Sequence, residues 1–210
     1  KSKIPGSPGI LVNQIPSTQT LTITLEDKIA QIEVDLYYVV IEEYDVITRY
    51  SCIRNMGKSS VNLNRALSCN MEFYHSNFDQ ISLSGSYGNE KTFARAPLRQ
   101  SQSTIESLRG FSSHIQHAFI ALTDSSATED SGQVHSANLI YSGNFMGVTE
   151  VQQTKTTRIQ LGLNSFQFQW ILKAGEEFYT PEAVLVQTSQ GIGEMSRIYH
   201  RLYRDCLNKG

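Results

Sequence analysis

A chain of 210 residues, 40% hydrophobic and 18% charged, is long enough for one domain with a substantial core, and this composition excludes a disordered or coiled-coil protein. The net charge is -2 at pH 7, and scattered lysines and arginines predict no basic surface for a nucleic acid or an anionic membrane. No apolar run approaches the roughly 20 residues that a membrane-spanning helix needs, so we expect a soluble protein.

The cysteines indicate the compartment. Cys52, Cys69 and Cys206 form an odd set without the short spacings of a zinc site, which argues against both a metal centre and a disulfide framework. We therefore expect free thiols, a cytoplasmic protein, and no metal or other cofactor. The apolar cluster at 10–12 is too short for a secretory signal, and the chain has no initiator Met, which is consistent with a start inside a longer protein.

The first half of the chain predicts strands. After a Pro- and Gly-rich opening, Leu21, Ile23 and Leu25 alternate with threonines, the period of a half-buried strand. Further alternating or β-branched segments follow at 32–38, 44–53 and 61–71. The turn residues at 55–58 predict a hairpin after the second of these segments.

The second half continues the pattern and then changes. Alternation returns at 145–151 and 157–163, whereas the polar segment 88–110 is compatible either with edge strands or with a long functional loop. The apolar residues Met195, Ile198 and Leu202 then repeat at helical spacing. The sequence therefore predicts an all-β, antiparallel sandwich over 1–188 and one C-terminal α-helix within 189–210.

Two local motifs suggest chemistry only weakly. Gly191 and Gly193 between a strand and a helix imitate a dinucleotide-binding turn, but Ser196 replaces the third glycine and no parallel βαβ units follow. His114 and His117 stand beside serines, as in a metal pair or a Ser-His nucleophile, yet a third ligand and a nucleophile-elbow pattern are missing. A structural loop is the favoured interpretation of the second motif.

An aromatic stripe suggests sugar binding. Phe166, Phe168 and Trp170 alternate with glutamines, which would place three rings on one face of a strand, as in a stacking platform for sugars. The favoured alternative is that the rings fill the space between two sheets while the glutamines face solvent. The acidic residues Glu42, Glu43 and Asp45 lie close together, but nothing near them predicts a raised pKa, so they receive no catalytic role.

Several short sequence motifs, taken together and in order, resemble those of a known family. They lie at 25–28, 44–49, 65–68, 112–114, 141–145, 180–186 and 195–204. The chain resembles, over nearly its whole length, the N-terminal β-supersandwich domain of the bacterial α-galactosidases of glycoside hydrolase family thirty-six, and we expect that domain's first strands to be missing from it.

The resemblance implies a retaining enzyme that removes terminal α-linked galactose from raffinose-type oligosaccharides with two aspartates on a (β/α)₈ barrel. In the family the nucleophilic aspartate follows a Lys-Trp pair, whereas Trp170 lies between Gln169 and Ile171. No catalytic residue is therefore assigned to any position here. The expected role is that of a non-catalytic domain, inactive alone, whose terminal helix leads toward the missing barrel.

The resemblance also implies partners: the barrel of the same parent chain, further copies in a homo-oligomer, and an α-galactoside bound by the parent. Because a Gly-Asn turn with two large aromatic residues is costly to leave in water, we expect it to face the barrel. The candidate interface residues are Tyr141, Ser142, Gly143, Asn144, Phe145 and His114. Phe111 and 115–117 depart from the family pattern beside the shared Ser-Ser-His. A stand-alone carbohydrate-binding module and a purely structural interaction domain remain the alternatives.

Overall fold

The computed structural model describes residues 9–10 and 17–207. Its strands are β1 (Thr18–Asp27), β2 (Ile32–Ile41), β3 (Val46–Asn55), β4 (Val61–Leu63), β5 (Leu67–Phe73), β6 (Asp79–Ser86), β7 (Asn89–Pro97), β8 (Gln102–Glu106), β9 (Gln116–Thr123), β10 (Val134–Ile140), β11 (Phe145–Val151), β12 (Thr157–Leu163), β13 (Trp170–Leu172), β14 (Glu177–Tyr179) and β15 (Glu182–Thr188). A 3₁₀ turn, η2 (Glu42–Tyr44), joins β2 to β3, and the helix α1 (Gly191–Leu202) continues into the π-helical turn η3 (Tyr203–Leu207).

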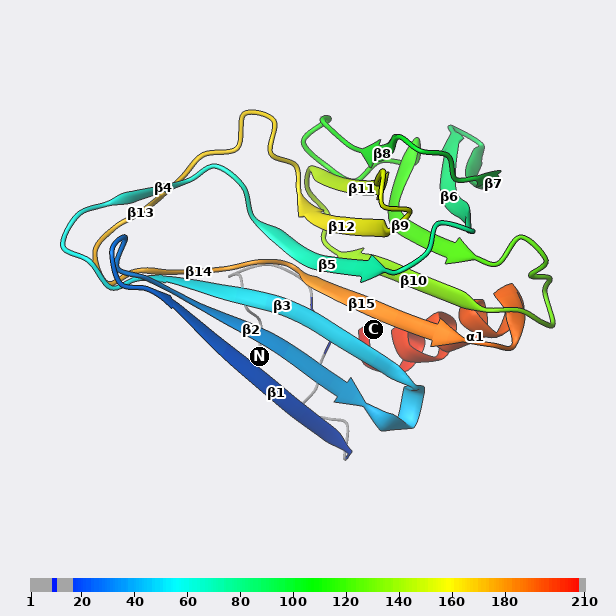
Figure 1. The fold of residues 1–210 in the computed structure, drawn as a ribbon, viewed down its shortest axis with the longest axis horizontal. Coiled ribbons are helices and arrows are strands. Elements are labelled where there is room, and N and C mark those ends of the chain that lie inside the picture. The colour runs from blue at the N-terminus through cyan, green and yellow to red at the C-terminus, as the bar shows by residue number, and fades with distance from the viewer. Residues whose placement is uncertain (1–8, 11–16, 208–210) are drawn as a thin grey trace.

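Over the described residues the strands form antiparallel sheets (Figure 1). A nine-stranded sheet has the order β1-β2-β3-β15-β10-β9-β6-β7, with β14 also paired to β3. A four-stranded sheet, β5-β12-β11-β8, faces part of it, and β4 and β13 pair at the far tip. The predicted all-β sandwich with one C-terminal helix is confirmed.

The core lies on both faces of the large sheet. Between the two sheets, Ile120, Phe145 and Leu161 are fully buried. On the opposite face, α1 packs with Met195, Ile198, Leu202 and Cys206 buried, which confirms the predicted apolar stripe of the helix. The role of 189–210 as a link to a further domain stays a prediction. No helix in the described ranges is long and apolar enough to cross a membrane.

The predicted hairpin at 55–58 is wrong. β4 pairs with β13, not with β3, because the turn residues bond elsewhere. The Asn55 side chain donates to the carbonyls of Ser59 and Leu172, and the Met56 amide donates to Gln31. The chain therefore leaves the large sheet at this turn and crosses to the tip.

Two further expectations are resolved by strand position. The polar segment 88–110 forms β7 and β8, the edge strands of the large and the small sheet, so the edge-strand interpretation is confirmed. The half-buried strand expected at 21–25 is instead an exposed edge: Leu21, Ile23 and Leu25 expose 58%, 40% and 52% of their surface. The alternation predicted the strand correctly, but no described residue covers its apolar side.

Cys52, Cys69 and Cys206 are buried, and no disulfide joins any of them among the described residues. Burial raises the pKa of the Cys69 thiol to about 11 and that of Cys52 above its ordinary value. Because the thiolate is the reactive form, both side chains are poor nucleophiles in the folded protein.

Gly162 lies where β12 passes β5 at a register shift. A Cβ there would come within 2.6 Å of the Leu67 Cα atom and 2.8 Å of the Ala66 carbonyl oxygen, and backbone cannot yield as a side chain can. We expect Gly162→Ala to lower the free energy of unfolding by about 1–3 kcal/mol in urea titrations. Gly57→Ala is the matched control, because its Cβ would meet the side chains of Asn55 and Gln31 at 3.2 Å or more. Equal stability of the two variants would contradict this account of the β5–β12 contact.

Candidate functional site

The predicted interface turn, 141–145, connects β10 to β11 and is bonded to the loop before β9. The Asn144 Oδ1 atom accepts a hydrogen bond from the Gly110 amide at 2.7 Å, and the Ser112 amide donates to the Ser142 carbonyl at 2.7 Å. The Ser112 hydroxyl lies 3.0 Å from the carbonyls of both Tyr141 and Gly143. The turn and the loop therefore form one unit, the 107–115/141–145 surface.

The residues of the turn differ in accessibility. Phe145 is fully buried in the core between the sheets, so its side chain forms no part of a surface and that expectation is corrected. Tyr141 is partly buried and packs against two core clusters, whereas Ser142 and His114 are exposed. The remaining candidates keep a position from which they can meet a partner, and their interface role stays a prediction.

Sequence reasoning missed two features of this surface. Leu108, Phe111 and Ile115 expose 47%, 54% and 37% of their surface beside the turn, although they follow no alternating pattern. Asn164 is buried below the turn, where its amide group donates to the Glu106 carboxylate and the Phe145 carbonyl. The three apolar loop residues therefore add to the candidate interface. The buried Asn164 holds the backbone at Phe145, directly after the turn, through its hydrogen bond.

The serine and histidine motif has a structural role. The Ser113 hydroxyl accepts a hydrogen bond from the Ile115 amide, and the Ser112 hydroxyl donates to the Tyr141 carbonyl of the 141–145 turn, so both serines bond to nearby backbone. Burial lowers the pKa of His117, whose Nδ1 atom has no partner among the described residues. The two serines therefore have the backbone-bonding role that the favoured interpretation gave them, and the role of the histidines stays a prediction. Within the described ranges, no group of three His, Cys, Asp or Glu residues could hold a metal ion.

The aromatic stripe is not a flat platform. Phe166 and Phe168 lie in a turn in which Gln167 has a φ of 55°, and the strand begins only at Trp170. Phe168 and Trp170 both pack against Phe178, with ring centroids 6.2 and 5.3 Å apart, while Phe166 is 63% exposed. The left-handed residue breaks the period of two, so three coplanar rings are not formed.

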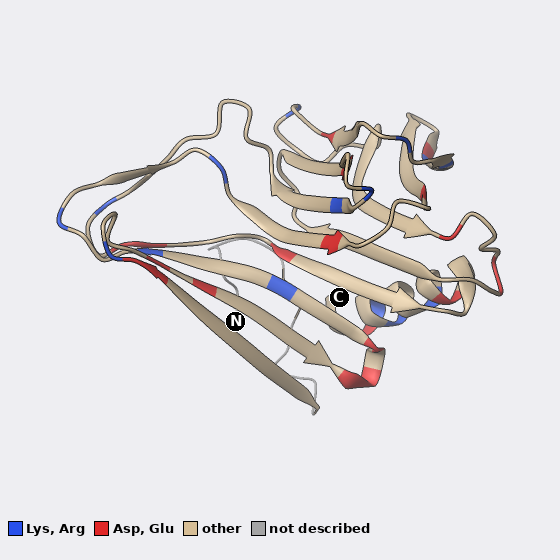
Figure 2. Ribbon diagram, viewed as in Figure 1, with Lys and Arg blue, Asp and Glu red and all other residues tan. Residues whose placement is uncertain are grey.

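Three carboxylates surround a single arginine. Arg54 contacts the carboxylates of Glu33 at 2.6 Å, Asp35 at 2.7 Å and Glu177 at 3.4 Å. The hydrogen bond from the Thr24 hydroxyl lowers the pKa of Asp35, and Arg54 lowers it further. A glycosidase acid needs the opposite shift, so this cluster stabilises ions rather than supplying protons. In Figure 2, the positions of positively and negatively charged residues are interspersed along the ribbon.

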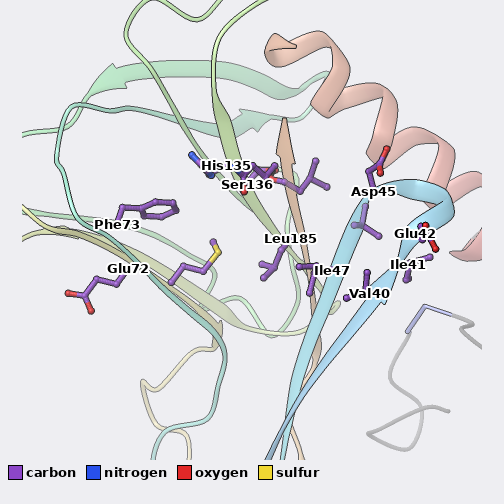
Figure 3. Close-up of a pocket in the computed structure, with 14 residues that line it drawn as sticks. Val40, Ile41, Glu42, Asp45, Ile47, Glu72, Phe73, His135, Ser136 and Leu185 are labelled. Carbon is purple, nitrogen blue, oxygen red and sulfur yellow. Dashed lines mark hydrogen bonds between the residues drawn. The ribbon is translucent and has the colours of Figure 1, made fainter. Parts of the chain in front are cut away.

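A cleft lies between the sheets, where β5, the end strand of the small sheet, faces β2, β3 and β15 (Figure 3). Val40, Ile47 and Leu185 line one side, and Met71 and Phe73 of β5 line the other. Its rim is polar and contains Glu42, Asp45, Glu72 and His135. The described lining of this cleft is therefore mainly apolar, with its carboxylates at the rim.

His135 at this rim should make stability depend on pH. Its ring lies 4.9 Å from that of Phe73, and burial lowers its pKa. The unfolded chain then binds a proton below about pH 6.5 that the folded chain resists, so stability is lost as the pH falls from 7 toward 5. We expect His135→Phe to reduce this loss in urea titrations at the two pH values, whereas the exposed control His114→Phe should leave it unchanged. An identical pH dependence in all three proteins would refute the assignment.

Comparison with known proteins agrees with the resemblance. The family model described as "Glycosyl hydrolase family 36 N-terminal domain" matches residues 1–173. Alpha-galactosidase AgaA of Geobacillus stearothermophilus is 41% identical over 210 residues, which cover 100% of this chain and 29% of that protein. Alpha-galactosidase 1 of Pediococcus pentosaceus is 38% identical over a match that covers 98% of this chain and 28% of that protein.

Solved structures agree as well. The crystal structure of AgaA superposes with a TM-score of 0.96, and the match covers 100% of this chain and 29% of that one. The crystal structure of the α-galactosidase of Lactobacillus brevis superposes with a TM-score of 0.94 at 35% identity, and the match covers 99% of this chain and 28% of that one. The chain thus spans less than a third of the length of these relatives. Because the family model covers most of the chain and the identity extends over all of it, the chain belongs to glycosyl hydrolase family 36 and corresponds to its N-terminal domain.

Proposed function

We propose that this chain is the non-catalytic N-terminal domain of a cytoplasmic α-galactosidase whose active site lies on a barrel outside these residues. The observation that carries the proposal is the match of the whole chain, at 41% identity and a TM-score of 0.96, to a protein named α-galactosidase. Variants of that relative were crystallised in complex with stachyose and with raffinose. The substrate class proposed for the parent is therefore the raffinose-type α-galactosides.

The chemistry of the described residues supports a non-catalytic role. Retaining hydrolysis requires one carboxylate as nucleophile and a second as proton donor, about 5 Å apart and in different environments. The gathered carboxylates Glu33, Asp35 and Glu177 instead share Arg54. A stand-alone carbohydrate-binding module is less well supported, because Gln167 and the packing on Phe178 break the aromatic platform.

The domain's contribution is proposed to be mechanical. The 107–115/141–145 surface combines exposed apolar side chains with a hydrogen-bonded backbone, the combination expected of a rigid docking face for the barrel or for a neighbouring subunit. Leu108, Phe111 and Ile115 would be covered in the complete protein. Homo-oligomer assembly is proposed on the same ground.

The activity prediction compares the chain with its parent. Residues 1–210 should hydrolyse no chromogenic α-galactoside, because they lack a suitable carboxylate pair, whereas the complete protein at equal molarity should. Turnover should be followed through successive purification steps to remove host enzyme. Activity of the fragment that is abolished by changing one of its own carboxylates, or a complete protein without activity, would overturn the proposal.

The interface prediction concerns Asn144. Asn144→Ala removes the acceptor of the Gly110 amide and should free the 107–115 loop, at a cost of about 1 kcal/mol in the isolated chain. In the complete protein it should alter kcat/KM or the oligomeric state, measured by light scattering. Asn89→Ala, in the exposed hairpin between β6 and β7, is the control. Parental kinetics and assembly in Asn144→Ala would count against this docking face.

A further inference from the structure

The inner face of the large sheet becomes polar at the end away from β1, which β6 and β7 form (Figure 1). Gln80 of β6 pairs with Leu122 of β9, which is buried in the core between the sheets. Ser82 pairs in the same way with the buried Ile120. Directly paired residues project to the same side of a sheet, so both polar side chains face the small sheet, where a sandwich normally places apolar ones.

The neighbouring edge strands leave this space open. The cross-strand partners of Gln80 and Ser82 on β7 are alanines, Ala96 and Ala94, which are too small to fill it. On β8, Ser103 lies two residues before the core residue Ile105 and therefore faces inward as well. These side chains, with 97–99 and Ser101, line a cleft of about 280 Å³, which we call the β6–β8 cleft.

Gln80 is a buried polar side chain with an unsatisfied atom. It is 8% exposed, and its Nε2 atom donates to the Ser103 hydroxyl at 3.2 Å. Its Oε1 atom has no hydrogen-bond partner among the described residues. Exchanging the two atoms of the amide group would leave the nitrogen unpaired instead. Because a buried amide atom without a partner costs free energy, we expect a partner from outside the described structure.

A second unsatisfied hydroxyl lies deeper on the same face. Thr149 of β11 is the cross-strand neighbour of Ser103 and is fully buried. Its Oγ1 atom also has no partner within residues 9–10 and 17–207. Two buried side chains with unsatisfied atoms thus lie next to Ser103, so packing of the domain alone does not explain the polar lining.

The lining matches the chemistry of a neutral, polyhydroxylated ligand. A hydroxyl group can donate to the Oε1 atom of Gln80 and can also exchange hydrogen bonds with the serine hydroxyls. The terminal torsion of glutamine is broad, so its rotation can turn the oxygen toward the cleft without moving the backbone. Pro97 and Leu98 offer hydrocarbon for the C–H groups of a ring.

Size and charge narrow the choice further. The volume lies below the roughly 300–1,000 Å³ of pockets for drug-sized molecules, so one sugar ring fits better than an oligosaccharide. The described lining contains no carboxylate, which argues against a cation. Arg99 supplies one positive charge, but a phosphate dianion has no proton to donate to the Oε1 atom of Gln80.

We propose that the β6–β8 cleft is an accessory binding site for one neutral monosaccharide unit. Gln80 and Ser103 bond to hydroxyls of the sugar, and the exposed Arg99 adds a further donor. The site is separate from the aromatic residues at 166–170 and from the 107–115/141–145 surface. It requires no catalytic group, and its existence does not depend on the activity proposed for the parent.

Amide chemical shifts of nitrogen-15-labelled 1–210, titrated with D-galactose and with D-glucose, test the site. A dispersed spectrum shows in the same sample that the chain is folded. At least one of the two sugars should shift the amides of β6 and β8 saturably, with a millimolar dissociation constant, and should leave those at 166–170 unchanged. No saturable shift with either sugar, saturation by inorganic phosphate alone, or shifts confined to 166–170 would overturn the proposal.

Two substitutions close the site by different means. Gln80→Met keeps the shape of the side chain but removes its amide, and Ala94→Leu fills the cleft from β7. Each should weaken the affinity at least tenfold, and Gln80→Met should not lower the free energy of unfolding in urea, because the lost amide is incompletely paired. Ala30→Leu, in the exposed β1–β2 turn, is the matched control. Unchanged affinity in both cleft variants would contradict the site.

Hydrogen exchange extends the test to the complete protein. The sugar that binds 1–210 should slow exchange in the peptides that cover β6 and β8 of the parent and of Ala30→Leu, and should have no such effect in Ala94→Leu. All three proteins should have the same kcat/KM for a chromogenic α-galactoside. An equal effect of the sugar on exchange in all three would refute the accessory site and leave the proposed function intact.

Discussion

The position of β15 in the middle of the large sheet determines most of the structure. This strand, the last along the described residues, pairs with β3 on one side and with β10 on the other. Its faces serve different cores: Ala183 packs between the sheets, and Val184 and Val186 pack toward α1. Without β15, strands β1, β2 and β3 would have no hydrogen-bonded connection to the β10-β9-β6-β7 half of the sheet.

Hydrogen bonds also hold β15 in place, on the side of β3 and on the side of α1. Glu182 is 1% exposed, and its carboxylate accepts hydrogen bonds from the Thr48 hydroxyl at 2.6 Å and from the Ile10 amide at 2.7 Å. On the helix side, the Tyr199 hydroxyl donates to the Val184 carbonyl. A buried charge is tolerated only with such partners, so the first strand residue of β15 also fixes the register of its neighbours.

The sequence predicted what depends on local pattern. Alternation identified the strands at 145–151 and 157–163, and the spacing of Met195, Ile198 and Leu202 identified the buried face of the helix. It could not predict what depends on distant partners. The turn at 55–58 failed as a hairpin because Asn55 bonds to Leu172, which lies 117 residues away.

The same limit applied to the candidate site. Phe145 looks like a turn residue in the sequence, yet the sheet above it places its ring in the core. The stripe at 166–170 was misread because a left-handed backbone at Gln167 has no clear signature in a non-glycine residue. The role of Ser112 and Ser113 was predicted correctly, since hydroxyls in loops commonly bond to nearby backbone.

The late position of β15 has a consequence during synthesis on the ribosome. Thr48 and Glu182, which meet across the β3–β15 boundary, are 134 residues apart, so translation at the usual rates separates their emergence by roughly 7 to 27 s. During that interval β1, β2 and β3 can form only a three-stranded ribbon with apolar side chains exposed. Pairing with β15 then joins these three strands to the rest of the large sheet.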